Sequence, residues 1–411
     1  MNRCLTLLLL LFPLTATAAP PVLEVTGGAT TLTNVVVSAP LPTGFDASIN
    51  SITLPDGMHV PAQIGEGSLL PDPVRGKRLT FVLPKLPAGE TLKLRPTTLN
   101  YVKAPPAFQF KETAGEYVDL SFDQRPVLRY INKPRDGTTK DTHELTFKPY
   151  HGVFDPTDGK SLITSTAYLS ADKTKMFPHH RGLFYGWLKI SYGDKTGIDT
   201  WHGRKGEYTQ HEKMLLTETG EVYGQHRAAI SWHGQDGALF ADEQREVTAF
   251  NMTGGTLIEF ASVLTTKQPL VKLDGDPQHA GFHFRAHQDV SAKETAKQTV
   301  YTRPDGKDKP AATRNWPAQK EHVNLTWDAM SFTLHDKRYT AVYLDRPDNP
   351  KEARFSERDY GRFGSYFVYD LTPETPLKVK YRVWIQEGEL TADQCENLSQ
   401  GFVHPPAVSV K

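Results

Sequence analysis

Histidines are concentrated in the middle of this sequence. Eleven of the 15 histidines lie between His143 and His287, a stretch that makes up about a third of the 411 residues. An imidazole changes its protonation state near neutral pH, and it is also a common ligand of transition metals. The concentration therefore predicts a site for proton transfer, or for metal-assisted hydrolysis or elimination.

The run DPQHAGFHFRAH at residues 276–287 is the strongest local pattern. Successive side chains of a strand point to opposite faces, so a strand here would bury its Ala and Phe side chains. The opposite face would carry His279, His283, Arg285 and His287. At about 3.3 Å per residue, His279 and His283 would stand roughly 13 Å apart, too far to bind one ion. One of them could join histidines from elsewhere, or the row could line a groove for an extended polar substrate. A solvated strand face is the alternative.

A second pattern is the run FPHHRGLFYGW at residues 177–187. Pro178 places the histidine pair at a turn that enters a strand. Because neighbouring strand side chains diverge, only one of the two imidazoles is expected to face a given site. The residues that share one face would be His179, Arg181, Tyr185 and Trp187. Aromatic rings beside Arg and His are typical of sugar sites, where ring C–H faces stack on them. An ordinary core strand with a buried Trp is the alternative.

Two further segments carry candidate side chains. These are the run DTWHGR at 199–204 and the run EYTQHE at 207–212. Gly203 and Gly206 lie within and between the two runs, which predicts a loop. Loops held by rigid sheets often carry functional residues, so His202 and His211 are candidate partners of the pair at 179–180. The run RFSERDYGRFG at 354–364 adds Arg358 and Tyr360 as substrate-binding candidates, with a purely salt-bridged loop as the alternative.

Several mechanisms lack their sequence signals. No GxSxG nucleophile elbow, P-loop or dinucleotide-binding run is present. Ordinary glycoside hydrolysis uses two carboxyl groups, and the sequence does not select a pair. The candidates are Glu207, Glu212, Asp276, Glu357 and Asp359. The histidine surplus therefore favours a metal-assisted hydrolase or a lyase.

The charge and cysteine contents exclude other classes. Lys+Arg and Asp+Glu are 47 each, so there is no net field to attract nucleic acid or an anionic membrane. The two cysteines, Cys4 and Cys395, have no ligand spacing and cannot form a disulfide framework.

The first residues predict export. A positive start at Met1 to Arg3, an apolar run at 5–14 and the A-x-A site at 16–18 are typical of a signal peptide spanning 1–18. No later run approaches 18 consecutive apolar residues, so we expect a periplasmic or secreted protein without membrane insertion.

The rest of the chain predicts a mostly β fold. Short apolar runs separated by Pro and Gly favour a small Ig-like β-sandwich at 19–105, ending near Ala104-Pro105-Pro106. Alternating runs continue beyond it, which predicts a large antiparallel β-sandwich at 106–411. The expected strands there are 117–122, 183–190, 257–264, 280–286, 339–344 and 379–385. A helix is expected at 391–400, with Thr391 as its N-cap.

Five runs together resemble a known family. They are FPHHRGLFYGW, DTWHGR, DPQHAGFHFRA, TRNWP and PDNPKEARFSERDYGRFGSYF, within residues 110–390. This set is similar to the bacterial exported proteins grouped under the label "methane oxygenase PmoA". The methane monooxygenase subunit of that name is an integral membrane protein, so the label's chemistry is not carried over. The resemblance implies a β-sandwich domain and, by analogy, a carbohydrate role, and it transfers no catalytic residues.

These observations lead to one main hypothesis and two alternatives. The main hypothesis is an exported hydrolase or lyase acting on an extracellular glycan or modified sugar. Its acid/base or metal centre would comprise His180, His202, His211 and His283, and a divalent metal would draw ligands from these together with His179 and His279. Arg181 and Arg285 would bind anionic or hydroxyl groups, and Trp187 and Trp201 would stack on the sugar. The alternatives are a non-catalytic carbohydrate-binding or surface module and, third, metal-dependent oxidation as the family label implies.

Overall fold

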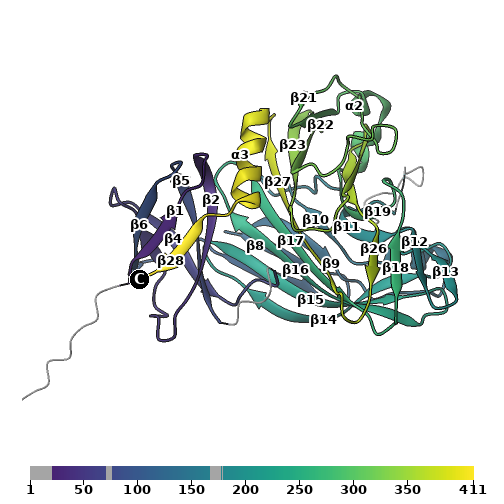
Figure 1. Cartoon of the computed structure of the whole chain (residues 1–411), viewed down its shortest axis with the longest axis horizontal. Helices are drawn as coiled ribbons and strands as arrows, with labels where there is room; N and C mark the ends of the chain where they lie inside the picture. The colour runs from purple at the N-terminus through teal and green to yellow at the C-terminus, as the bar shows by residue number, and fades with distance from the viewer. Residues whose placement is uncertain (1–20, 71–75, 167–176, 178) are drawn as a thin grey trace, which may run out of the picture.

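The computed structural model describes residues 21–70, 76–166, 177 and 179–411, and there the chain is mostly β-structure (Figure 1). Its large antiparallel sheets confirm the predicted fold class. The helical elements of these ranges are short, namely α1 (Lys140–Thr146), η1 (Gln288–Ser291), α2 (Lys293–Ala296) and α3 (Ala392–Val403). None of the helices in the described ranges has the length and apolar character needed to cross a bilayer. The expected signal peptide at 1–18 lies outside the described residues.

The N-terminal part forms an antiparallel sheet with its own hydrophobic core. Its strand order is β2 (Leu32–Pro40), β5 (Arg78–Leu86), β4 (His59–Gly65), β3 (Ser51–Thr53), β6 (Thr91–Thr97), β1 (Leu23–Thr26) and β28 (Ala407–Val410). The last strand of the chain therefore pairs with the first, with Leu23 opposite Val410 (Figure 1). The predicted 106–411 domain includes this strand, which pairs with β1 and covers one edge of the N-terminal sheet.

Two large sheets form the sandwich that follows residues 98–107. The first has the order β24 (Arg354–Arg358), β25 (Arg362–Tyr366), β19 (Ala280–Arg285), β11 (Gly182–Trp187), β10 (Tyr150–Val153), β9 (Arg125–Ile131), β8 (Tyr117–Phe122) and β7 (Phe108–Thr113). The second has the order β14 (Tyr208–Glu218), β15 (Tyr223–His233), β16 (Leu239–Asn251), β17 (Thr256–Thr265), β27 (Leu377–Glu387), β23 (Lys337–Asp345), β22 (Trp327–Leu334), β20 (Val300–Arg303) and β21 (Gly306–Lys307).

The two large sheets pack face to face through aromatic side chains. Phe282 of β19 stacks on Phe260 of β17, with ring centroids 4.3 Å apart, and on Tyr381 of β27 at 5.1 Å. Since every second residue of each strand faces this core, the opposite face of the first sheet is left to be covered by other segments. A smaller sheet joins the sandwich, with the order β13 (Lys195–Ile198), β12 (Lys189–Tyr192), β18 (Val271–Asp274) and β26 (Tyr369–Leu371).

Helix α3 lies between the N-terminal sheet and the sandwich (Figure 1). Thr391 caps it as predicted, because its hydroxyl accepts the Gln394 N–H at 3.2 Å and the Gln394 side chain accepts the Thr391 N–H at 2.9 Å. The helix continues to Val403, three residues beyond the predicted end.

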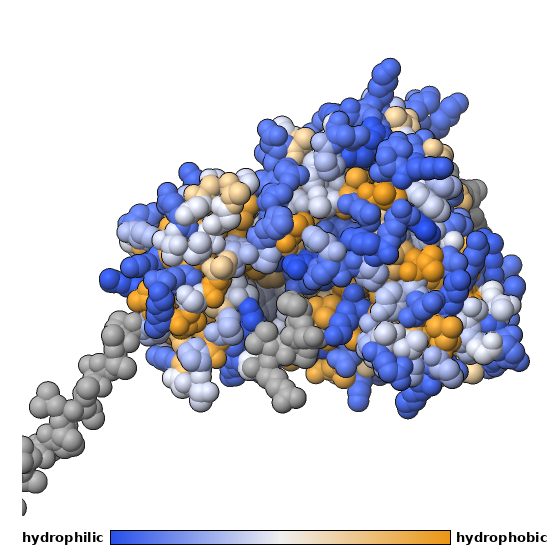
Figure 2. Space-filling model, in the orientation of Figure 1, coloured by the Kyte–Doolittle hydropathy of each residue, from blue (hydrophilic) through white to orange (hydrophobic). Residues whose placement is uncertain are grey.

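A cavity of about 290 Å³ opens between the N-terminal sheet and the second large sheet, lined among others by Arg78, Tyr223 and Phe402. No residue of the 276–287 or 177–187 runs lines this cavity. On the face drawn in Figure 2, polar residues predominate and hydrophobic ones form small separate patches.

Candidate functional site

The candidate site lies on the face of the first large sheet that points away from the sandwich core. Strands β11 and β19 are neighbours there, with Phe184 directly opposite His283. Trp201, from the 199–204 segment, covers both side chains, with ring centroids 4.7 Å from Phe184 and 4.9 Å from His283. Trp201 is fully buried, so this face is a second packed layer and not a solvated surface.

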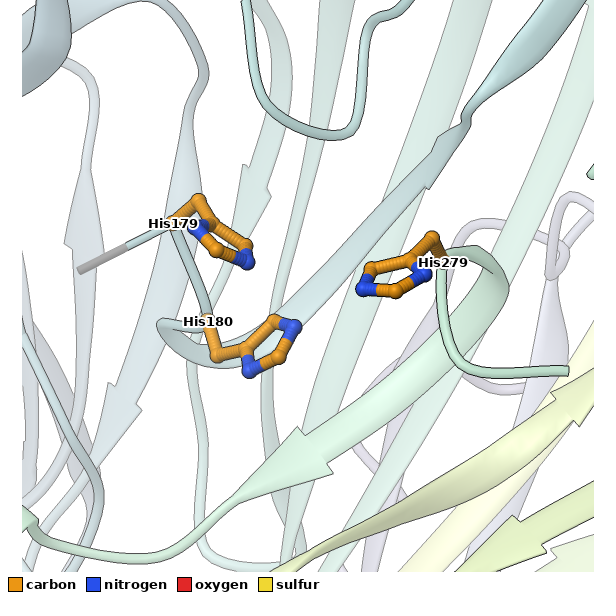
Figure 3. A group of neighbouring side chains, drawn as sticks. All are labelled: His179, His180 and His279. Atoms are coloured by element: carbon orange, nitrogen blue, oxygen red, sulfur yellow. The ribbon is translucent and has the colours of Figure 1, made fainter. Parts of the chain in front are cut away.

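Four imidazoles from three separate segments meet at the edge of this layer. The ring centroid of His179 lies 4.3 Å from that of His180 and 4.3 Å from that of His202. His202 in turn lies 4.9 Å from His279. One ring nitrogen each of His179, His180 and His279 lies within 4.8 Å of the other two, and Figure 3 shows the His279 ring facing the pair. We call these four residues the imidazole cluster.

A turn brings the adjacent residues His179 and His180 to the same place. The His180 N–H donates to the Phe177 carbonyl at 3.0 Å, and Phe177 has a positive φ of 58°. Strand β11 begins only at Gly182, so the divergence of neighbouring strand side chains does not apply to this pair. The expectation that only one of the two imidazoles would face the site was therefore wrong.

His279 also belongs to a turn. Its N–H donates to the Asp276 carbonyl at 3.1 Å, and strand β19 begins at the next residue, Ala280. At Gly281, φ is 88° and a Cβ atom would lie 2.0 Å from the Ser365 carbonyl oxygen, so glycine is required where the chain enters the strand. The turn separates His279 from the row that was expected to include His283.

Two aspartates orient the imidazoles of the cluster. Asp199 Oδ2 lies 2.8 Å from His202 Nδ1, and Asp276 Oδ1 lies 2.9 Å from His279 Nδ1. Because a carboxylate only accepts hydrogen bonds, Nδ1 carries the proton in both rings and Nε2 carries the lone pair. Asp199 Oδ1 also accepts the backbone N–H of Trp201 at 3.1 Å and of His202 at 2.9 Å, which fixes this loop.

The other two imidazoles have buried nitrogens without hydrogen-bond partners in the described chain. These atoms are Nε2 of His179 and both ring nitrogens of His180. Leaving a buried polar group unsatisfied costs on the order of 1–3 kcal/mol, so such groups call for a partner that protein atoms do not provide.

Burial keeps the imidazoles of His179, His180 and His202 in the neutral form. It lowers the pKa of His180, and the neighbouring His179 and Arg362 lower that pKa further. Burial likewise lowers the pKa of His179, with an added contribution from His202. The pKa of His202 is also lowered by burial, although Asp199 opposes the shift. Neutral imidazoles accept protons and bind transition metals.

Two aromatic rings border the cluster. The Tyr360 ring is parallel to that of His180, with centroids 6.4 Å apart, and Tyr360 is partly exposed. Phe177 lies 4.9 Å from Tyr360 and is 38% exposed. We call Phe177 and Tyr360 the rim of the cluster. Arg285 holds Tyr360 in place, since it donates to the Tyr360 carbonyl and its guanidinium lies 5.0 Å from the centroid of the Tyr360 ring.

Two predicted members of the centre lie outside the cluster. The Nδ1 of His211, on β14, is 3.1 Å from the Tyr130 hydroxyl. Both nitrogens of His283 are occupied, because Nε2 donates to the Ala280 carbonyl at 2.9 Å and Nδ1 accepts from Arg362 at 2.9 Å. Neither residue is placed to act with the other imidazoles, and we withdraw both from the candidate centre.

Most of the predicted substrate-binding residues have structural contacts. Tyr185 and Trp187 face the sandwich core and are buried. Trp201, within the 199–204 segment, is also buried, so none of the three rings can stack on a sugar. Arg181 donates to the Glu144 and Leu145 carbonyls at the end of α1. Arg358 donates to Asn315 Oδ1 and to the Glu357 carbonyl. Of this group, Tyr360 alone combines partial exposure with contact to the cluster.

The roles of Asp199, Asp276 and Phe177 were missed by the sequence reasoning. A usable signal was present, because DTWH at 199–202 and DPQH at 276–279 share the same D-x-x-H spacing. That spacing fits a turn in which a carboxylate receives the imidazole three residues later, as the structure shows twice.

The fold and the site define a β-sandwich protein with a buried imidazole cluster on the outer face of one sheet. The chain belongs to the family of unknown function DUF6807, whose model matches residues 117–400 and so includes every residue of the cluster. That family is described without an activity, and the resemblance to proteins labelled "methane oxygenase PmoA" stays a prediction.

Comparison with known structures gives distant likenesses, and no curated protein matches the sequence significantly. A glycosyl hydrolase family 38 protein from Enterococcus faecalis is 10% identical, with a TM-score of 0.41, over 95% of this chain and 47% of that one. An alpha-mannosidase from Enterococcus faecalis V583 is 9% identical, with a TM-score of 0.42, over 95% and 46%. A galactose mutarotase-like protein from Clostridium acetobutylicum is 10% identical, with a TM-score of 0.33, over 68% and 98%. This chain spans about half the length of the first two.

Proposed function

We propose that the protein is an exported enzyme that cleaves an extracellular glycan or modified sugar by hydrolysis or elimination. Its centre is the imidazole cluster, His179, His180, His202 and His279. The observation that carries this proposal is the meeting of four imidazoles from three segments that are far apart in the sequence. Structural histidines usually have their nitrogens bonded by protein groups, as His283 does, whereas His180 has neither nitrogen bonded.

In this proposal His202 is the general base. Asp199 holds its Nδ1–H, so Nε2 is the atom that accepts a proton from water or from a sugar carbon. The same carboxylate then stabilises the imidazolium that forms, and the pair returns the proton to the leaving oxygen. Its lowered pKa keeps His202 unprotonated and ready to act at neutral pH.

The rim supports a carbohydrate substrate. Tyr360 and Phe177 are aromatic, partly exposed, and adjacent to the imidazoles, which is the arrangement that stacks on the C–H face of a sugar ring. A non-catalytic binding module would use the same rim but would not need the clustered imidazoles, and the buried Trp187 and Trp201 provide no further platform for it.

Turnover of a panel of polysaccharides by the full chain tests the proposal. Reducing ends report hydrolysis, and ultraviolet absorption of unsaturated sugar ends reports elimination. We expect His202→Ala and His279→Ala to lose turnover, with His211→Ala as the matched control outside the cluster. Equal turnover in all three variants, or glycan binding without any turnover by the wild type, would overturn it.

A further inference from the structure

We infer that His179, His180 and His279 form a transition-metal site of the zinc type, with a fourth position left for water or substrate. Binding of the metal is a property of the cluster itself. Its use in glycan cleavage rests on the function proposed above. His202 lies beside the three ligands as the proton-transferring group and is not a ligand.

The distances allow one ion to reach all three rings. The three candidate ligand atoms lie within 4.8 Å of one another. In a tetrahedral site with bonds of about 2.0–2.1 Å, ligand nitrogens are roughly 3.4 Å apart, so the rings need to close by about 1 Å. His279 lies on a turn and its side chain is 26% exposed, so it has room to make this movement.

A metal would supply a partner for one ring nitrogen of His179 and one of His180. His179 Nε2 and both nitrogens of His180 are buried and unbonded in the described chain, and a neutral imidazole nitrogen with a free lone pair is a ligand ready to bind. Three protein imidazoles with one open position form the ligand set of catalytic zinc rather than of closed structural zinc.

One of the three proposed ligands, His279, has the hydrogen bond that is found behind metal ligands. A histidine that binds a metal usually donates its other N–H to a carboxylate or carbonyl, which fixes the tautomer and makes the ring more basic. His279 does so to Asp276 at 2.9 Å. Asp199 holds the neighbouring His202 in the same way at 2.8 Å.

Two other groups of potential ligands in the described chain lack these features. In the group of His322, Asp328 and Glu357, the Arg303 guanidinium already holds both oxygens of Glu357 at 2.6 Å, so its positive charge occupies the place of a cation. In the group of His287, Asp289 and His335, the Asp289 and His335 side chains are 60% and 56% exposed. Solvent competes for such exposed groups, and a tight site there is not expected.

The ligand type selects the class of metal. Imidazole nitrogen binds zinc, copper, nickel and iron, whereas calcium and magnesium require mainly oxygen ligands. We therefore take Zn²⁺ and Co²⁺ as probes, because Co²⁺ replaces zinc in tetrahedral sites and absorbs visible light when four-coordinate.

Titration of the chelator-treated full chain with Zn²⁺ by calorimetry, and with Co²⁺ by visible absorption, tests the assignment. We expect one equivalent to bind the wild type, and His279→Ala and His180→Ala each to lose at least about 100-fold in affinity. His211→Ala removes a half-buried histidine elsewhere and should bind like the wild type. If His180→Ala fails to fold by circular dichroism, His279→Ala decides, because its partly exposed side chain can be removed without a cavity.

The outcomes separate this inference from the proposed function. No binding by the wild type, or unchanged affinity in folded His279→Ala, would overturn the metal site and leave glycan turnover to be judged on its own. One equivalent bound through His279, without turnover of any glycan, would support the metal site while the proposed activity fails.

Discussion

The Nδ1 of His279 lies 2.9 Å from Oδ1 of Asp276, three residues earlier in the same turn. The same step of three residues joins His202 to Asp199 at 2.8 Å. Two segments on different sides of the cluster thus share the same Asp–His hydrogen bond. In each, the carboxylate fixes the tautomer of the imidazole and directs its lone pair away from the protein backbone.

Asp276→Asn should weaken Zn²⁺ binding by about 10- to 100-fold, because the amide no longer holds the His279 tautomer or contributes a charge. Calorimetric titration measures the effect. The fold should be unaffected, since the Asp276 side chain is 38% exposed. Asp289→Asn, which removes a carboxylate from the exposed pair with His335, is the control and should bind zinc normally. Equal affinities in the two variants would argue against an orienting role for Asp276.

His202→Ala should separate catalysis from metal binding. Loss of a general base lowers kcat by about 10²- to 10⁴-fold, whereas the metal equivalent should be retained because His202 is not a ligand. Parallel measurements of turnover and of bound Co²⁺ check this. A variant that loses the metal as well would make His202 a fourth ligand and require a different base.

In the 177–187 run the expected shared face was wrong, because His179 lies in the imidazole cluster whereas Tyr185 and Trp187 lie in the sandwich core. In β19 the strand pattern predicted which residues share a face but not what covers that face. Phe282 and Phe284 lie in the sandwich core and His283 lies on the other side, as alternation requires. The sequence could not show that Trp201, 82 residues before His283, would bury that other side. Both faces of β11 and β19 are covered, so the period-two pattern could not distinguish a substrate platform from core for Tyr185 and Trp187.

Only part of the candidate site could be predicted from the sequence, because local turns reorient some of its side chains. The clustering of histidines and the runs that contain them identified His179, His180, His202 and His279 as candidates. Applying strand alternation to the pair at 179–180, and treating 279 as part of a strand, gave the wrong neighbours for these imidazoles, because the turn at each point redirects the side chain. Other candidate residues are excluded from the site because distant residues hydrogen-bond to them, as Arg362 does to His283. The local spacing of residues in the sequence cannot predict such long-range hydrogen bonds.

Trp187→Ala should destabilise the large sandwich by about 3–5 kcal/mol, since it empties a site for a large side chain in a closed core. Trp187 is fully buried and packs on Tyr185, with ring centroids 4.8 Å apart. Urea unfolding measured by fluorescence gives the free energy. A loss below about 1 kcal/mol would contradict the core position and return Trp187 to the list of possible sugar platforms.

Tyr360→Ala should raise the KM for a glycan substrate by about tenfold, the equivalent of roughly 1.4 kcal/mol of stacking and burial at the rim. Tyr360→Phe keeps the ring and should bind substrate like the wild type. Both variants should keep their zinc affinity, because Tyr360 contributes no ligand. A KM that is unchanged in Tyr360→Ala would remove this ring from the substrate site.

Asp328→Asn should change how stability depends on pH. Asp328 is fully buried, and neither of its carboxylate oxygens has a hydrogen-bond partner in the described chain. Burial raises the pKa of Asp328 well above its ordinary value, and the neighbouring Glu357 carboxylate raises that pKa further, against the opposing effect of Arg303. At a pH between the ordinary pKa of Asp328 in the unfolded chain and its raised pKa in the folded protein, the folded protein holds a proton that the unfolded chain releases.

Because the folded state binds more protons, the free energy of unfolding should fall as the pH rises above about 4, by at most about 1.4 kcal/mol per pH unit. Asparagine stays neutral and can donate to Glu357, so Asp328→Asn should lose this part of the slope and be more stable than the wild type near pH 8. Denaturant unfolding between about pH 5 and pH 8 measures the two profiles. Asp370→Asn, at an exposed aspartate of β26, is the control and should follow the wild type. If Asp328→Asn keeps the wild-type slope, Asp328 is ionised in the folded protein, and a cation or water must then satisfy its oxygens.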